Sequence, residues 1–216
     1  MRSGLLVALT LCVASPALGQ GWIEYTSRDD LFIVNFPAEP VITRITYPSE
    51  YGITLPGRVY TARADASRYV VTVIDYSTAP QIHTERIKGC TGYPDTCTNR
   101  GPNDLRGALD YAVSKYLQGD AKVTYYAYAD TDRVEGRRVQ LTNADMSRTF
   151  VAIYMHENRL YILEGTVPPD LPPPALFQQS LGFYDTEGIR VRYTTIYRNG
   201  YPPPPREETR GRLAGC

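Results

Sequence analysis

Cysteine and histidine, two residue types used as nucleophile and base, occur together in one segment of the chain. Cys90 lies downstream of His83, and a thiolate beside an imidazole is the pair that cysteine enzymes use. With Cys97 the same side chains could bind a metal ion, but structural zinc sites place about two to four residues between ligands and need a fourth donor. The residues between the cysteines, which include Gly92 and Pro94, favour a turn that brings the two sulfurs together. We therefore predict a disulfide between Cys90 and Cys97, which would remove both chemistries.

The other candidates for catalysis or metal binding each fail a test of spacing or context. The nearest approach to a Gly-x-Ser-x-Gly nucleophile elbow is at Ser180, where the first glycine is missing. Acidic residues alternate over residues 130–135 as in a calcium loop, but Val134 occupies the place of an oxygen donor, so a polar hairpin turn is predicted. His156 lies in a predicted tight turn, where we expect a solvated side chain. We therefore predict no catalytic, metal-binding or cofactor-binding residues, and no cofactor.

Tyrosine is the one residue type in excess, with 18 in 216 residues. Aromatic rings with a polar tip suit contact surfaces. Tyr126 and Tyr128 alternate with Tyr125 and Ala127, so two tyrosines share one face of a predicted strand. These rings either cover sheet edges and fill gaps under helices, or they form a binding surface. The candidate binding residues are Tyr126 and Tyr128, together with Tyr93 in the cysteine loop.

Composition excludes several classes of protein. The chain has 23 basic and 23 acidic residues and a pI near 6.7, so it lacks the basic surface that binds nucleic acid. A hydrophobic content of 43% is ordinary for a globular protein and argues against disorder. The chain has 2 histidines, too few for a zinc site built from three imidazoles.

The N-terminal sequence predicts export. Arg2 precedes an apolar run over residues 5–13, and the small residues Ala17 and Gly19 stand just before an expected cleavage at Gln20. The apolar run is shorter than the roughly twenty residues that span a bilayer. We predict a signal peptide over residues 1–19, a periplasmic or extracellular location that favours disulfides, and no membrane span in the mature chain.

Strand and helix patterns alternate along the mature chain. Period-two alternation over residues 22–76 predicts strands, and the run 69–74, apolar on both faces, predicts a central one. Residues 77–103 lose this periodicity and collect glycine and proline, which predicts a long irregular loop closed by the disulfide. Apolar residues from Leu105 to Leu117 recur at helical spacing, which predicts an amphipathic helix.

We expect that helix to be capped by Asn103 and closed by Gly119. Further strands are then predicted, followed by a short helix over residues 175–181, and all of residues 20–198 are assigned to a single domain. The tail, 199–216, is predicted to be flexible. Its four consecutive prolines fit either a spacer or a polyproline II ligand. The predicted strands after the long helix cover residues 121–129, 137–142, 148–155 and 159–166, with further strand residues between 183 and 193.

Three short motifs lie in the predicted strands and near the short C-terminal helix. They are Phe32-Ile33-Val34-Asn35-Phe36-Pro37, Gly136-Arg137-Arg138-Val139, and the run 158–163 with Ser180-Leu181-Gly182-Phe183 after it.

With these motifs, residues 22–193 resemble the Mog1/PsbP-like α/β/α sandwich family. The resemblance implies an α+β fold with a largely antiparallel sheet, on which one long amphipathic helix and a short C-terminal helix pack. Named members of such families act as binding or assembly modules. Because the segment 77–103 is longer than the family pattern, no functional residue is carried over.

These observations predict a secreted, non-catalytic binding or assembly module of the bacterial cell envelope. Its partner would be another envelope protein or a small ligand. One alternative is a periplasmic protein that binds a small ligand or glycan. A second is an envelope hydrolase, which would need a deep pocket where His83 or His156 lies beside a carboxylate and a hydroxyl.

Overall fold

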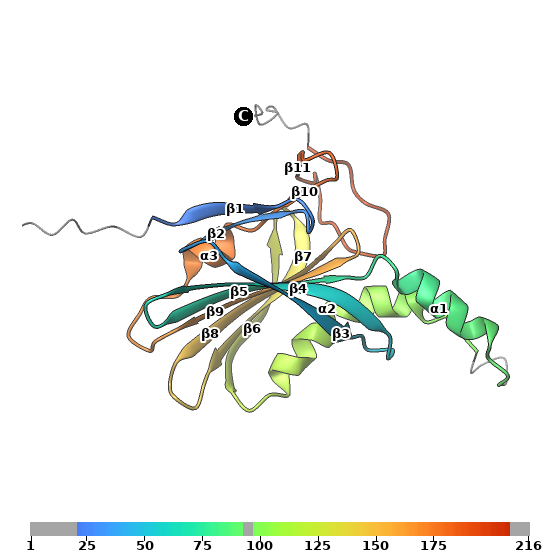
Figure 1. The fold of residues 1–216 in the computed structure, drawn as a ribbon, viewed down its shortest axis with the longest axis horizontal. Coiled ribbons are helices and arrows are strands. Elements are labelled where there is room, and N and C mark those ends of the chain that lie inside the picture. The colour runs from blue at the N-terminus through green and yellow to red at the C-terminus, as the bar shows by residue number, and fades with distance from the viewer. Residues whose placement is uncertain (1–20, 93–96, 208–216) are drawn as a thin grey trace, which may run out of the picture.

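A computed structural model describes residues 21–92 and 97–207 of the protein, and these form an α+β fold with two antiparallel sheets (Figure 1). The predicted signal peptide 1–19 and the candidate Tyr93 lie outside the described residues. The small sheet has the strand order β1 (Ile23–Ser27), β2 (Phe32–Phe36), β10 (Gly182–Tyr184) and β11 (Arg190–Val191). The large sheet has the strand order β3 (Val41–Pro48), β4 (Thr54–Ala64), β5 (Ser67–Asp75), β9 (Arg159–Val167), β8 (Arg148–His156), β7 (Val134–Thr142) and β6 (Lys122–Thr131).

The two longer helices and the small sheet cover opposite faces of the large sheet (Figure 1). The long helix α2 (Gly101–Leu117) lies on one face, and α1 (Ala79–Lys88) packs against it. The small sheet and the short helix α3 (Ala175–Gln179) lie on the other face. None of the helices in the described part of the chain is long and apolar enough to span a bilayer.

The large sheet is buried on both faces, and successive residues of its strands enter two different cores. In β8, Val151 and Ile153 belong to the core under α2, whereas Ala152 and Tyr154 belong to the core under the small sheet. This division follows from the period of two in a strand. The same pattern in β5 confirms the predicted central strand. The apolar stripe of α2 faces the sheet as predicted, with Ala108 and its neighbours Leu109, Ala112 and Val113 buried.

The prediction of one sheet with one long helix needs two corrections. The first two strands and the last two form a sheet of their own, because β10 pairs with β2 and not with the large sheet. The segment 77–103 is not irregular throughout, since it contains α1. Proline in the first turn of α1 suits a helix start, but only Ala79 and His83 are buried, so apolar periodicity in this helix is weak.

The predicted disulfide between Cys90 and Cys97 is present, just after α1. Helix α2 begins at Gly101, before the predicted cap at Asn103, and its cap residue Arg100 makes no side-chain capping bond. Pro102 in the first turn therefore marks the start of α2 better than an N-cap side chain does.

The turn predicted at residues 130–135 is confirmed as the β6–β7 hairpin. Asp132 and Arg133, at its tip, have φ angles of 45° and 63°. Two successive residues with positive φ form the turn that matches the twist of paired strands. Of the acidic residues here, Asp132 forms ion pairs with Arg190 and Arg192, and Glu135 pairs with Arg137 and Arg198.

Gly136 in β7 lies where a side chain has no room. A Cβ atom at this position would contact the ring of Tyr154 and lie 2.5 Å from the carbonyl oxygen of Ile153. We expect Gly136→Ala to lower the free energy of unfolding by about 2 kcal/mol, because backbone and a buried ring must move. Gly89→Ala is the matched control, since no atom lies within 4 Å of its Cβ position and its φ is −94°. Urea unfolding of both variants measures the difference, and equal midpoints would contradict the prediction.

Candidate functional site

Strand β6 carries three tyrosines with half-exposed side chains at a free edge of the large sheet. Tyr125, Tyr126 and Tyr128 are 47%, 48% and 52% exposed. In the described part of the chain β6 pairs with β7 alone and ends the sheet on this side. Tyr126 and Tyr128 lie opposite Val139 and Arg137, and cross-strand partners share a face. The two tyrosines are therefore on one face, as predicted, and it is the face that carries α2.

Arg137 connects these tyrosines to α2. Its guanidinium lies 5.6 Å from the centre of the Tyr128 ring. It also pairs with Asp110 of α2 at 3.3 Å and with Glu135 at 3.1 Å. Burial, and then Glu135, raise the pKa of Tyr128, so its hydroxyl stays protonated at neutral pH and can donate a hydrogen bond. We call this surface the tyrosine–arginine face and define it by Tyr126, Tyr128, Arg137 and Asp110.

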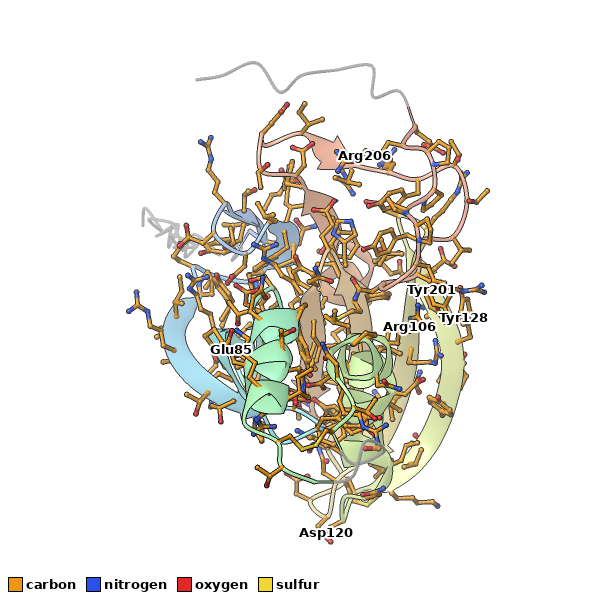
Figure 2. The ribbon with its side chains drawn as sticks, turned by 90° about the vertical axis from the view of Figure 1, so that its right-hand side faces the viewer. Glu85, Arg106, Asp120, Tyr128, Tyr201 and Arg206 are labelled. Carbon is orange, nitrogen blue, oxygen red and sulfur yellow. A yellow bond between two sulfur atoms is a disulfide. The ribbon has the colours of Figure 1, made fainter. Side chains whose placement is uncertain are left out.

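An open groove of about 580 Å³ follows the solvent-facing side of α2. The turn between β3 and β4 forms the other wall of the groove. Gly107 leaves room for the side chain of Glu50 against α2, since a Cβ atom at position 107 would lie 2.7 Å from Glu50 Oε2. Arg106 also lines two smaller hollows, of about 120 and 230 Å³. Figure 2 shows Arg106 beside Tyr201, and its guanidinium is 4.7 Å from that ring's centre. The groove is lined by Glu50, Tyr51, Pro102, Asn103, Arg106, Gly107, Asp110, Tyr111 and Ser114.

A hydroxyl, a carboxylate and an imidazole meet beneath this groove. Ser49 Oγ donates to Asp104 Oδ2 at 2.6 Å, and His83 Nε2 donates to the same oxygen at 2.8 Å. All three residues are buried, with exposures of 3%, 4% and 0% for Ser49, His83 and Asp104. Ser49 is 55 residues from Asp104 in the sequence, and His83 is 21 residues from it. No local sequence pattern could therefore predict this contact.

This cluster has the residue types of a hydrolase site but not its connections. In a catalytic triad the base contacts the nucleophile, whereas here Ser49 and His83 both bond to the carboxylate. None of the three lines the groove. The arrangement instead ties the β3–β4 turn and α1 to the first turn of α2. Asp104 thus holds the walls of the groove together.

His156 is buried, with 1% exposure, so the prediction of a solvated turn residue was wrong. It is the last residue of β8 and packs against Phe183 of the small sheet at a ring distance of 4.5 Å. Its Nε2 is hydrogen bonded to the hydroxyl of Tyr193 at 2.8 Å. Burial, and then Arg206 and Arg159, lower the pKa of His156 to about 3, so the ring is neutral at physiological pH. The residues that cover His156 are distant from it in the sequence, so no local pattern indicated that it would be buried.

The structure therefore brings together only part of the predicted site. Tyr126 and Tyr128 share a surface, and Cys90 and Cys97 form the disulfide. Arg137 and Asp110 complete the surface, and the sequence had indicated only that Arg137 begins a strand and that Asp110 lies within the amphipathic helix. Within residues 21–92 and 97–207, no three His, Cys, Asp or Glu side chains lie close enough together to hold a metal ion.

Comparison with known proteins finds similar chains among solved structures. No family model matches the chain, and no curated protein sequence does either. Among solved structures, it is similar to cyanobacterial PsbP (CyanoP) from Synechocystis sp. PCC 6803, with 10% identity and a TM-score of 0.44. The likeness covers 80% of this chain and 99% of that one. We transfer no residue role from that protein.

Proposed function

We propose that this protein is a non-catalytic binding module that docks another protein through the tyrosine–arginine face and the adjoining edge of β6. The observation that carries the proposal is the exposure of Tyr126 and Tyr128, 48% and 52%, on a strand that has no neighbour on its outer side among residues 21–92 and 97–207. Tyrosine and arginine are among the residue types most enriched where binding energy concentrates in protein interfaces. An open strand edge adds main-chain donors and acceptors for an extended segment of the partner.

The ion pair of the tyrosine–arginine face could be exchanged for contacts with a docked partner. Asp110 is 65% exposed in its side chain and Arg137 is 18% exposed, so their ion pair lies at the boundary with water. Exposed pairs contribute at most about 1 kcal/mol to stability, which leaves both groups able to exchange partners. The buried Ser49, His83 and Asp104 already hold secondary-structure elements together, and this supports a role other than catalysis.

The location belongs to the same proposal. A disulfide between Cys90 and Cys97 persists in an oxidising compartment such as the periplasm or the extracellular medium. The N-terminal sequence is of the kind that directs export. The proposed partner is therefore a protein of the cell envelope.

Photo-cross-linking tests the docking surface. A benzoylphenylalanine at position 128 is expected to cross-link a partner in an envelope extract, and excess unlabelled wild-type chain should compete. The Tyr126→Ser/Tyr128→Ser chain should compete at least about tenfold less well, because it lacks both rings. Val41→Ser/Ile42→Ser is the matched control, since these side chains are 69% and 49% exposed on β3, the opposite edge of the sheet. Equal competition by the two double variants would reject the face.

The groove along α2 favours one alternative function. Its volume, about 580 Å³, is in the range of small-molecule sites, and Tyr51 and Tyr111 could stack on a sugar ring. A thermal-shift screen against envelope sugars separates the two functions, because a ligand that binds only the folded chain raises its melting temperature. A shift lost in Tyr111→Ala and retained in Tyr126→Ser/Tyr128→Ser would support the carrier and place its site in the groove.

A further inference from the structure

The proline-rich segment near the C-terminus forms an exposed strap on the domain. We define the strap as residues 198–206, which contain Tyr201 and the four prolines Pro202–Pro205. Tyr201 is 56% exposed, and Pro202, Pro203 and Pro205 are exposed as well. Figure 2 labels Tyr201 near one end of the strap and Arg206 at the other. The predicted flexible tail, 199–216, is thus attached to the domain as far as Glu207.

The entrance of the strap is fixed by main-chain and side-chain bonds. Tyr197 N donates to Arg133 O at 2.8 Å, and Glu135 N donates to Tyr197 O at 3.0 Å. Gly200 has a φ of 80° and lies against Arg106, which donates to its carbonyl oxygen through Nε and Nη2 at 3.3 and 3.2 Å. A residue other than glycine would be strained in this conformation. The chain therefore enters the proline run from a fixed position on α2.

The exit is fixed by a second group of bonds. Thr194 N and Oγ1 donate to Pro205 O at 2.9 and 3.1 Å, and Glu207 N donates to Arg192 O at 2.8 Å. Arg206 forms ion pairs with Asp185 at 2.7 Å and Glu157 at 3.0 Å. The strap thus returns to the same domain that it leaves.

The conformation between these ends follows from the sequence. Proline fixes φ near −65°, and a residue that precedes proline is kept out of the helical region. Residues 201–204 each precede a proline, so the run is confined to extended, polyproline II backbone. Such a helix has three residues per turn, which places Pro202 and Pro205 on one side. The strap is therefore ordered before any partner binds.

We propose that the strap is a presented polyproline II ligand for an aromatic-lined groove of a partner protein. The spacer interpretation of this sequence fails because a segment tied at both ends to one domain separates nothing. Polyproline II ligands bind well because little conformational freedom is lost, and the two fixed ends reduce that loss further. The strap adjoins the tyrosine–arginine face, since Arg198 and Tyr201 line one hollow with Asp110 and Arg137. The proposal does not depend on the docking proposed there, because the strap is recognised through its prolines and not through Tyr126 or Tyr128.

An array of recombinant WW, SH3 and EVH1 domains is the probe for this surface. At least one domain is expected to bind the full chain, and Pro202→Ala/Pro205→Ala should raise its Kd at least about tenfold. The matched control is Pro172→Ala/Pro173→Ala, which alters two exposed prolines before α3 and should leave Kd within about twofold. Circular dichroism and melting temperature verify that each variant is folded. Binding to none of the domains, or equal binding by the two double variants, would overturn the proposal.

A second variant tests the importance of the fixed ends. Arg206→Ala removes the ion pairs with Asp185 and Glu157 and leaves all four prolines in place. Its Kd for the same domain should rise about threefold or more, towards that of a synthetic peptide of residues 200–207. Wild-type affinity no better than that of the free peptide would contradict presentation by the fold.

Discussion

Lowering the pH from 6 to 4 is expected to reduce the free energy of unfolding by about 2.5 kcal/mol through His156 alone. In the folded chain burial, and then Arg206 and Arg159, lower the pKa of this ring to about 3, from the ordinary value of 6.5. Between these pH values the unfolded chain binds a proton that the folded chain does not. Stability that is complete above pH 6.5 is therefore lost as the pH falls towards 3, and urea unfolding at a series of pH values measures the slope.

His156→Gln isolates this contribution, because the amide can bond to Tyr193 and does not titrate. Its stability should vary less between pH 6 and pH 4, by the amount assigned to His156. The carboxyl groups titrate in both chains and cancel in the comparison, among them Glu164 and Asp185, whose pKa values are shifted. Burial raises the pKa of Glu164, which favours folding in acid, whereas for Asp185 bonds from Ile189 N and Arg206 outweigh burial and lower the pKa. Parallel pH profiles for wild type and His156→Gln would show that this ring does not govern acid stability.

Asp104→Ala is expected to lower the free energy of unfolding by about 4 kcal/mol. The carboxylate is fully buried and accepts hydrogen bonds from Ser49 and His83. Alanine would leave both donors buried without an acceptor and would release α1 and the β3–β4 turn from α2. Chemical denaturation at neutral pH measures the loss, and hydrogen exchange of α1 amides should rise with it.

Asp110→Ala is the matched control, since it removes the same side chain from the same helix. Asp110 is 65% exposed in its side chain and pairs with Arg137 at 3.3 Å, so the expected change is at most about 1 kcal/mol. Asp104→Asn keeps the side-chain volume and can accept one of the two hydrogen bonds, so its loss in the free energy of unfolding should lie between those of Asp110→Ala and Asp104→Ala. Equal losses in Asp104→Ala and Asp110→Ala would show that the buried cluster does not join the three elements.

Local pattern was enough to predict α2 and most strands. The apolar residues from Leu105 to Leu117 repeat at helical spacing, and the run 69–74 has no polar side. In each segment the local pattern therefore predicts which side chains are buried. The disulfide could also be predicted from the sequence, because only a short segment of turn-forming residues separates Cys90 from Cys97. The common face of Tyr126 and Tyr128 followed from strand geometry.

The sequence by itself thus determined which residues alternate, which helix is amphipathic and which cysteines pair, since these depend on neighbours in the chain. Only the tertiary structure decided that β10 pairs with β2, that His156 is buried, and that Ser49 and His83 share one oxygen of Asp104. The hydroxyl of Tyr161 donates to Asp30 O across 131 residues. Such contacts depend on which strands become neighbours, and no periodicity within a segment records that. The strap depends on both the local sequence and the tertiary structure, because its prolines set the backbone conformation and residues distant in the sequence hold its ends.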